Sequence, residues 1–344
     1  MIVTRTPFRI TLGGGGTDLP SFYREHGGYV FTMAINKYMY ICLNRRPLAA
    51  PKIVIRYSSV ETVDSIEEIR HPLAREALKL HDVRDHIELT SIADMPAKAG
   101  LGSSGSYTVG LLTAIRAYKR LPVAPQVVAE EACHIEIDVL KEPVGKQDQY
   151  IAAFGGFQEL DIAKDGAVRV SPVPVDFVTV NELVSKARMY YTGIQRSATA
   201  VLKAQNEAAA QKAKPDHARV VDNLLKIKAL GGDIRQAFAD RDMDRFAVLM
   251  DQHWMHKRAM SAGISLSVLD QLYDQVKKDY GVLGGKIIGA GGGGFVLLYA
   301  PDNGRGLDEY MARHGMPRVS YFPSMQGTKV VTDMSPFDDF DAVR

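Results

Sequence analysis

One glycine- and serine-rich segment, which stands between a predicted strand and a predicted helix, constrains this chain most. The segment PAKAGLGSSGS runs from Pro96 to Ser106. A strand is predicted over residues 86–93 and a helix over 104–118, where apolar residues recur at helical spacing. Small residues let a backbone approach a ligand closely, and the free N–H groups at a helix start attract an anion. The segment therefore predicts a phosphate-binding loop; the alternative is a flexible glycine loop without a ligand.

Two other phosphate-binding motifs fit this segment less well. A Walker A loop requires the triplet Gly-Lys-Ser/Thr, and no such triplet occurs in the chain. Gly100, Gly102 and Gly105 satisfy the dinucleotide pattern GxGxxG, but that pattern begins in a tight turn after its strand and has an acidic residue about 20 positions further on. Here the loop is longer, and the first acidic residue after it, Glu130, lies inside a predicted helix. A nicotinamide-dependent oxidoreductase is therefore disfavoured.

Two acidic residues, Glu136 and Asp148, follow the loop. Glu136 lies in a helix predicted over residues 125–140, and Asp148 stands at a predicted helix start after Pro143 and Gly145. Phosphoryl transfer uses one carboxylate to bind Mg²⁺ and another to orient or deprotonate the attacking hydroxyl. The two residues are suited to these roles if the loop between them folds back. The alternative, two solvated surface charges, stays open on the residues alone.

Glycine runs also occur near both ends of the chain. The segment PFRITLGGGGTDLPSF, Pro7–Phe22, places Arg9 before four glycines and Thr17 and Asp18 after them. It is interpreted either as a ligand loop with a nearby cation or as a glycine-rich turn capped by Asp18. The segment KIIGAGGGGFVLLY, Lys286–Tyr299, repeats GxGxxG, but a strand rather than a helix follows, so the dinucleotide interpretation fails again. Such a run is explained if it lies beside another glycine loop.

The length and the order of predicted elements indicate two domains. A chain of 344 residues with 46% hydrophobic composition exceeds what one core usually needs. Pro172 and Pro174 interrupt the pattern, so we expect domains over residues 1–180 and 181–344. The class is α+β, because helices outnumber strands in the second half. Further strands are predicted at 29–43, 53–57, 155–162, 167–173, 188–192, 286–288, 294–300 and 318–323, and further helices at 197–213, 217–230, 234–240, 243–256 and 265–280.

Composition excludes several classes of function. The 42 basic and 40 acidic residues give a net charge of +2, which offers no reason to expect nucleic acid or a charged membrane as partner. Two cysteines, Cys42 and Cys133, exclude a disulfide framework and a Cys-rich zinc site. The first residues lack the pattern of a signal peptide, and the apolar runs are too short to span a bilayer. We expect a cytoplasmic protein with a small-molecule partner; a homodimer is compatible with the sequence.

Three segments together resemble the motifs of a known family, the GHMP kinases. Pro7–Asp18 is similar to the first motif, Pro96–Ser106 resembles the second, phosphate-binding motif, and Lys286–Phe295 resembles the third. The three occur in the family's order, and the resemblance covers nearly the whole chain. It implies a two-domain GHMP kinase fold, with an N-terminal domain like ribosomal protein S5 domain 2 and a ferredoxin-like C-terminal domain. It also implies ATP and Mg²⁺ as cofactors and an active site between the domains.

The resemblance also implies roles for particular residues. Asp148 acts on the substrate hydroxyl and Arg9 supports it as the second catalytic residue. The metal ligands are Ser104 and Glu136. The nucleotide-binding residues are Lys98, Gly100, Leu101, Gly102, Ser103, Ser104 and Gly105. The substrate-binding residues are Gly15, Gly16, Thr17, Asp18 and Arg196.

Two departures from the family pattern bear on substrate and geometry. Galactokinases carry Glu-His where this chain has Gly15-Gly16, which puts galactose in doubt and leaves room for a bulkier ligand. The separation of Glu136 and Asp148 is one residue longer than in the mevalonate kinase motif. Within the family, four segments resemble the bacterial D-glycero-D-manno-heptose 7-phosphate kinases: GGGGTDLPSF, GKQDQYIAAFGG, YTGIQRSA and HWMHKRAMSAGIS.

This closer resemblance implies phosphorylation of the anomeric hydroxyl of a heptose 7-phosphate for surface polysaccharide synthesis. A phosphorylated substrate needs a cationic pocket, for which Arg196 is the first candidate and Lys257 and Arg24 follow. Each of the three is alternatively a plain surface charge. Kinases for fucose, galactose or mevalonate, and a GHMP-fold sugar sensor without turnover, remain as alternatives.

Overall fold

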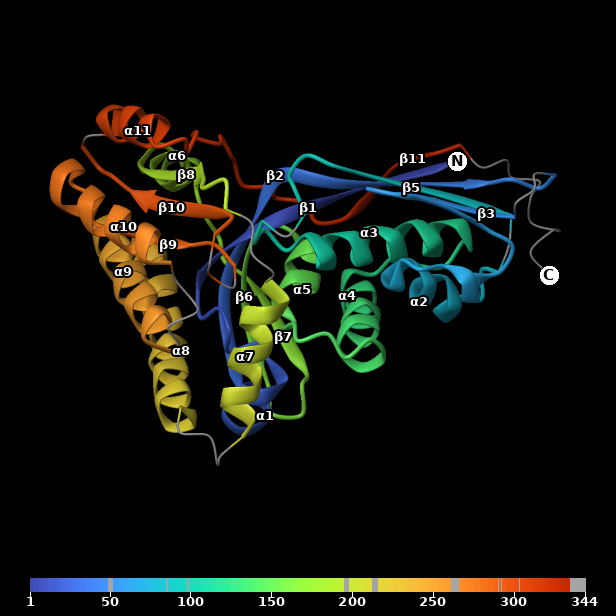
Figure 1. Ribbon diagram of the computed structural model, residues 1–344, viewed down its shortest axis with the longest axis horizontal. Coiled ribbons are helices and arrows are strands. Elements are labelled where there is room, and N and C mark those ends of the chain that lie inside the picture. The colour runs from blue at the N-terminus through green and yellow to red at the C-terminus, as the bar shows by residue number, and fades with distance from the viewer. Residues whose placement is uncertain are drawn as a thin grey trace.

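The computed structural model describes residues 1–48, 52–84, 86–97, 99–194, 198–211, 216–260, 266–289, 291, 293–302 and 304–334. Within these ranges the chain forms one sheet of eight strands and one of three, with helices packed against both (Figure 1). Nearly all strand pairs are antiparallel; β3 and β5 form the parallel pair among the described strands. This combination confirms the predicted α+β class.

The larger sheet is built around two long strands, β1 (Ile2–Gly13) and β2 (Gly28–Arg45). Both faces of β2 are buried over its first eight residues, whereas burial alternates further along. Helix α8 accounts for one buried face, since the rings of Phe31 in β2 and Phe238 in α8 lie 5.5 Å apart. The other strands of this sheet are β3 (Ile53–Arg56), β4 (Val60–Val63), β5 (Ile87–Ala93), β6 (Phe157–Ile162), β7 (Val168–Pro172) and β11 (Lys329–Asp333).

The smaller sheet lies in the second half of the chain. Its strands are β8 (Ala187–Tyr191), β10 (Phe295–Tyr299) and β9 (Gly284–Ile287), in that order. The helices are α1 (Pro20–His26), α2 (Pro72–Leu80), α3 (Ser103–Tyr118), α4 (Pro125–Cys133), α5 (Gln147–Phe154), α6 (Phe177–Lys186), α7 (Ala198–Ala210), α8 (His217–Ala239), α9 (Met243–Met260), α10 (Ser267–Tyr280) and α11 (Gly304–Arg313). Short 3₁₀ and π turns occupy Ile66–Glu68 and His134–Val139.

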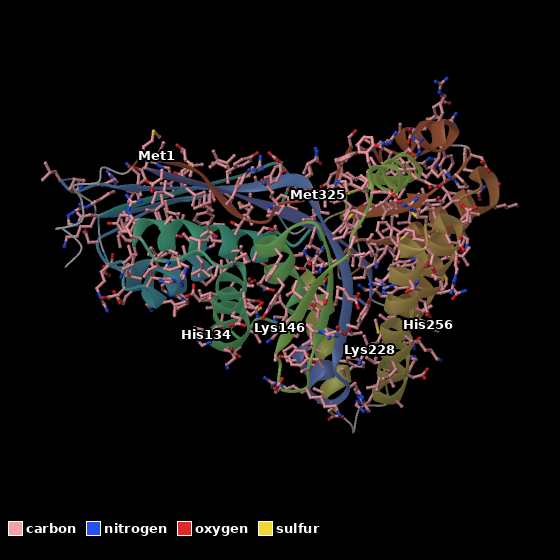
Figure 2. All side chains as sticks on the ribbon, turned by 180° about the vertical axis from the view of Figure 1, so that it is seen from behind. Met1, His134, Lys146, Lys228, His256 and Met325 are labelled. Atoms are coloured by element: carbon pink, nitrogen blue, oxygen red, sulfur yellow. The ribbon has the colours of Figure 1, made fainter. Side chains whose placement is uncertain are left out.

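The last described strand, β11, returns to the larger sheet and pairs with the start of β1 (Figure 1). The predicted division at residue 180 falls within α6 and stays a prediction. Figure 2 shows His134, in the π turn after α4, and His256, in α9, with the strands of the larger sheet between them. No helix of the described ranges has the length and apolar character of a membrane span.

Most predicted elements are confirmed, and two predictions are wrong. Residues 217–230 and 234–240 form the single helix α8 rather than two helices. Gly231 does not interrupt the helix; a Cβ there would lie 2.8 Å from the ring of Tyr29 and 3.0 Å from the nitrogen of Gly14, so glycine permits close packing. Residues 318–323 form isolated bridges instead of a strand. Pro317 directly precedes this segment and Pro323 is its last residue, and neither has an N–H donor.

The helix predicted over residues 125–140 is α4 followed directly by a π-helical turn at His134–Val139. A π turn accommodates one more residue than an α-helical turn, and such turns are frequent at functional sites. Glu136 lies within it.

Candidate active site

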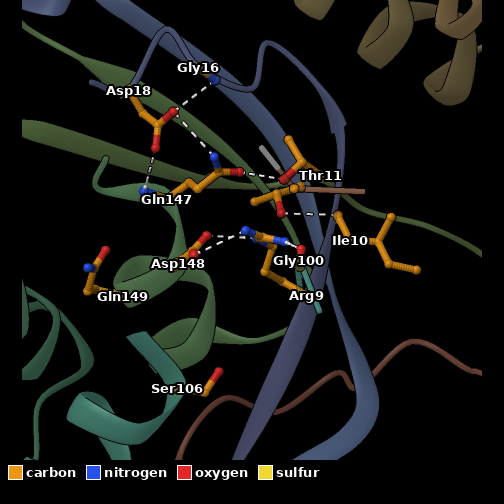
Figure 3. A network of polar contacts seen from close by, with 12 residues as sticks. Arg9, Ile10, Thr11, Gly16, Asp18, Gly100, Ser106, Gln147, Asp148 and Gln149 are labelled. Atoms are coloured by element: carbon orange, nitrogen blue, oxygen red, sulfur yellow. Dashed lines mark hydrogen bonds and ion pairs between the residues drawn. The ribbon is translucent and has the colours of Figure 1, made fainter. Parts of the chain in front are cut away.

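An ion pair between Arg9 of β1 and Asp148 of α5 lies at the centre of the site (Figure 3). Arg9 Nε donates to Asp148 Oδ1 at 2.7 Å, and Nη2 donates to Oδ2 at 3.0 Å. This two-point contact fixes the plane of the carboxylate. Arg9 Nη1 also donates to the carbonyl of Gly100, and the Arg9 backbone nitrogen donates to the Leu101 carbonyl at 3.1 Å. One arginine therefore joins β1, the glycine-rich loop and α5.

Glycines allow the loop from Gly100 to Gly105 to reach this pair. Gly100 and Gly102 adopt φ angles of 85° and 78°, and Gly102 is the N-cap residue directly before α3. A Cβ on Gly102 would lie 3.1 Å from Asp148 Cγ, and one on Gly105 would lie 2.8 Å from Asp148 Cβ. The start of α3 therefore approaches Asp148 more closely than any other residue type would permit. Leu101 is buried beneath this loop.

The third glycine run packs on the second, as the sequence predicts for two neighbouring glycine loops. A Cβ on Gly289 would lie 2.7 Å from the Gly100 Cα, and a Cβ on Gly294 would lie 2.2 Å from the Ala99 carbonyl oxygen. Ser103 and Ser104 open α3 beside this contact, and Ser104 is exposed to solvent. Lys98, predicted to bind nucleotide, lies outside the described residues.

Glu136 is buried behind the start of α3, with a relative exposure of 1%. Gln149 Nε2 donates to Glu136 Oε1 at 3.0 Å, while the Gln149 Oε1 atom has no partner among the described residues. Burial raises the pKa of Glu136 to about 7, although hydrogen bonds from Gln149 and Ser104 oppose the shift. The structure thus brings the two predicted metal ligands, Ser104 and Glu136, into contact.

Asp18 lies on the other side of Asp148, held by the first glycine run (Figure 3). Its Oδ1 accepts from the Gly16 nitrogen at 3.0 Å and from Gln147 Nε2 at 3.3 Å, and its Oδ2 accepts from the Gln147 nitrogen at 3.2 Å. Burial and then the charge of Asp148 raise the pKa of Asp18. Gly145 permits this packing, since a Cβ there would lie 2.0 Å from Asp18 Oδ2.

Thr17, which the sequence places in the substrate site, has its hydroxyl engaged by the backbone. The hydroxyl donates toward the carbonyls of Gly14 at 2.8 Å and Tyr29 at 2.7 Å, and it accepts from the Tyr29 nitrogen at 3.0 Å. The side chain is fully buried. These contacts anchor the glycine turn to β2, which positions Asp18.

A cavity opens between these groups and the helices of the second half. It combines both catalytic candidates with three of the predicted substrate residues, Gly15, Gly16 and Asp18. Residues that the sequence interpretation missed also contribute. Its full lining is Arg9, Thr11, Gly15, Gly16, Asp18, Leu19, Val144, Gly145, Gln147, Asp148, Leu202, Gln205, Lys257, Lys286 and Gly289.

Gln205 and Gln147 are the clearest of the missed residues. Gln205 on α7 is 3% exposed, and neither polar atom of its side chain has a hydrogen-bond partner among the described residues. Gln147 accepts at Oε1 from the Thr11 hydroxyl at 2.5 Å. The position of Gln147 next to Asp148 is a signal that sequence reading could have used. Nothing in the alanine-rich segment around Gln205 distinguishes that residue.

Of the three basic candidates for a substrate phosphate, Lys257 lines the cavity. Arg24 is an exposed residue of α1 and does not line it, and Arg196 lies outside the described residues. Lys286, which opens the third glycine run, is a second cavity lysine that the sequence interpretation did not select. Burial, and next the charge of Arg9, lower the pKa of Lys257 to about 8. Burial, with the charges of Lys257 and Arg9, lowers the pKa of Lys286 well below its ordinary value.

Comparison with known proteins agrees with this geometry. The family model for the GHMP kinases N terminal domain matches residues 67–156, and that for the GHMP kinases C terminal domain matches residues 234–308. A D-glycero-alpha-D-manno-heptose 7-phosphate kinase of Campylobacter jejuni subsp. jejuni serotype O:2 is 28% identical over 313 residues, covering 87% of this chain and 89% of that protein.

Two solved structures share the fold. A D-glycero-D-manno-heptose 1-phosphate kinase from Bacteroides thetaiotaomicron has a TM-score of 0.78 at 22% identity, with 97% of this chain and 100% of that chain covered. The galactokinase of Lactococcus lactis, complexed with galactose, has a TM-score of 0.73 at 18% identity, with 95% and 94% covered. Both domains of one family are thus present in order on a shared two-domain fold. The chain belongs to the GHMP kinases, phosphotransferases that act on an alcohol group.

Proposed function

We propose that this protein transfers the terminal phosphoryl group of ATP to the anomeric hydroxyl of D-glycero-D-manno-heptose 7-phosphate. The 1,7-bisphosphate product would serve as a precursor of surface polysaccharide. The observation that carries the proposal is the Arg9–Asp148 pair, which borders both the glycine-rich loop and the cavity that contains Asp18. Such a position puts one carboxylate between a phosphate site and a sugar site.

In this proposal Asp148 is the residue that acts on the sugar. Its carboxylate orients the attacking hydroxyl and accepts the proton as the phosphoryl group is transferred. The two hydrogen bonds from Arg9 hold the carboxylate in one orientation. Arg9 also places positive charge beside the Gly100 loop, where negative charge develops during transfer.

ATP is assigned to the loop from Gly100 to Gly105, with Lys98 as a further contact. The N–H groups at the start of α3 point outward from the helix and carry its positive end, which suits phosphate oxygens. Gly100 and Gly102 adopt positive φ angles, so the loop turns without side chains that would cover those groups. Ser104, at the start of α3, is exposed to solvent and places a hydroxyl on the side where the phosphates are proposed to bind.

A magnesium ion fits the donors at Ser104 and Glu136. Mg²⁺ in phosphoryl-transfer sites takes one or two carboxylates together with substrate phosphates, so no larger cluster is required. Among the described residues no group of three or more His, Cys, Asp and Glu side chains gathers around one point. The unpartnered Gln149 Oε1 and the raised pKa of Glu136 suit a nearby cation. Such an ion would neutralise charge on the phosphates.

The sugar is assigned to the cavity beside Asp18. Asp18 is held by three donors and would accept a hydrogen bond from a sugar hydroxyl. Gly15 and Gly16 leave the space that a larger side chain would fill. Arg196 stays a proposed contact of the sugar's own phosphate. The Campylobacter relative, whose name gives a heptose 7-phosphate as substrate, supports this choice of sugar.

ADP release with a panel of acceptors tests the proposal. The panel contains D-glycero-D-manno-heptose 7-phosphate, sedoheptulose 7-phosphate, mannose 6-phosphate, galactose, fucose and mevalonate. We expect the manno-heptose phosphate to give the highest kcat/KM, with a 1,7-bisphosphate product visible by phosphorus NMR. A preference for an unphosphorylated sugar or mevalonate would change the assigned substrate but leave the assignment as a kinase in place. Tight binding of ATP and sugar without ADP release would indicate a sensor instead.

A further inference from the structure

Two lysines from different elements of the second half line the same cavity. Lys257 of α9 is 5% exposed and Lys286 of β9 is 1% exposed, yet both line the cavity. They are close enough that the charge of Lys257 lowers the pKa of Lys286, and Arg9 acts on both. The cavity is therefore bordered by three basic side chains, Lys257, Lys286 and Arg9, against two acidic ones, Asp18 and Asp148.

Neither lysine has a counter-ion among the residues that the structure describes. Lys257 Nζ donates to the Gly289 carbonyl at 2.6 Å, and Lys286 Nζ donates weakly to the Leu12 carbonyl at 3.4 Å. No ion pair joins either Nζ to a carboxylate of the described residues. An ammonium group has three N–H donors, and the contacts above use one of them on each lysine. Burying a charge without a partner costs free energy of folding. Two neighbouring buried lysines of this kind are therefore not explained by a role in stabilising the fold.

The surroundings do not supply the missing negative charge. His253, one turn before Lys257, is fully buried, and neither ring nitrogen has a hydrogen-bond partner among the described residues. The charges of Lys286 and Lys257 help burial to lower the pKa of His253 well below its ordinary value, so the ring stays neutral. Asp148 is already paired with Arg9. Asp18 raises the pKa of Lys257, but its effect is smaller than the lowering by burial and by the charge of Arg9.

The lysine pair also stands next to the reacting centre. Lys257 holds the carbonyl of Gly289, and Gly289 packs directly on Gly100. The Gly100 carbonyl in turn accepts from Arg9, the partner of Asp148. The two ammonium groups therefore lie where the third glycine run, the phosphate loop and the sugar cavity adjoin.

We propose that Lys257 and Lys286 together form a binding site for phosphate oxygens in this cavity. The inference deepens the proposed function and rests on it. The phosphate has two sources in such a reaction: the group that the sugar already carries, and the phosphoryl group that moves from nucleotide to sugar. Both present the same oxygens to the lysines, and the arrival of either supplies the absent counter-charge.

The test compares Lys257→Met and Lys286→Met with wild type and with Lys119→Met. Methionine retains the length and apolar stem of lysine and removes the charge. Lys119 provides a matched control, because its Nζ donates to a backbone carbonyl, that of His81, at 2.7 Å and lies outside the cavity. Lys257→Arg retains the charge and serves as a second variant if a methionine variant fails to fold, as judged by its thermal transition.

Two measurements separate the phosphate sources. Calorimetric titration without nucleotide gives the Kd for heptose 7-phosphate and for unphosphorylated heptose, and ADP release gives kcat and KM. If the sugar's own phosphate occupies the site, each methionine variant weakens heptose 7-phosphate roughly 10- to 100-fold and leaves the free heptose unchanged, as expected for a lost charged hydrogen bond. If the transferred group occupies it, sugar binding is unchanged and kcat falls by a similar factor.

Unchanged Kd and kcat in both methionine variants, within twofold of Lys119→Met, would overturn the inference. Failure of the proposed function has a different result: wild-type protein would release no ADP with any sugar. In that case titration with inorganic pyrophosphate still tests the site. Binding by wild type and Lys119→Met but not by the two cavity variants would support it, and equal binding or no binding by all four would overturn it.

Discussion

Replacing Lys257 by methionine should stabilise the protein at neutral pH, which is unusual for a buried polar residue. Burial lowers the pKa of Lys257 from 10.5 to about 8, and each unit corresponds to about 1.4 kcal/mol, so the charged side chain costs about 3 kcal/mol of folding free energy below pH 8. The variant removes this cost and loses the hydrogen bond to the Gly289 carbonyl, worth about 1 kcal/mol. A net gain of about 2 kcal/mol follows at pH 7.

The gain should disappear as pH rises. Above about pH 8 Lys257 loses its proton in the folded protein, while the unfolded chain keeps it until about pH 10.5. The unfolded state then binds more protons, so wild-type stability rises with pH across this window. The variant lacks the group and shows no such rise. By pH 10.5 wild type should be more stable by about 1 kcal/mol, because its neutral amine still donates to Gly289.

Urea unfolding at pH 7 and at pH 10 measures both ends of this change. The single tryptophan, Trp254, is buried on the same helix as Lys257, so its fluorescence reports the relevant unfolding. The quantity of interest is the difference in unfolding free energy between variant and wild type. A variant that is less stable than wild type at pH 7, or a difference that is independent of pH, would refute the account of Lys257 as a buried, unpaired charge.

Three further changes test the contacts at the centre of the site. Arg9→Lys loses the two-point contact with Asp148, so kcat should fall about 100-fold with the KM for ATP unchanged, and a fall within twofold would argue against positioning by Arg9. Gly145→Ala places a Cβ against the Asp18 carboxylate, so the KM for the sugar should rise about 10-fold; an unchanged sugar KM would show that Asp18 does not contact the sugar. Glu136→Gln should raise the Mg²⁺ concentration for half-maximal rate about 10-fold, and magnesium titration of ADP release would contradict the assignment if the two curves coincide.

The sequence predicts regular elements well where periodicity and flanking residues agree. α3 and the hairpin of β6 and β7 are confirmed within two residues at each end, and α9 begins where predicted but extends four residues further. The single helix α8 could not be foreseen, because a Gly-Gly pair is read locally as a break. In the structure Gly231 instead allows α8 to pack closely against the turn at Gly14, which is far away in the sequence. The return of β11 to β1 is likewise a non-local pairing without a local signal.

The residues of the site can likewise be predicted where a local motif marks them and not where distant segments determine their surroundings. Arg9, Asp148 and the glycine loop are predictable, because each belongs to a compact motif, and the structure brings them into direct contact. Gln205 and Lys286 are not, since their importance comes from burial against segments far away in the sequence. A buried polar side chain without a partner becomes visible only in three dimensions.

The central claim is that the carboxylate at Asp148 carries phosphoryl transfer to a sugar phosphate. Its most direct test is the rate of ADP release with D-glycero-D-manno-heptose 7-phosphate and ATP, for wild type and for Asp148→Asn. The substitution retains the shape of the side chain and removes the proton acceptor, so kcat should fall about 100- to 10,000-fold while the Kd for ATP stays within a few-fold. An Asp148→Asn variant with a kcat near that of wild type would contradict the account.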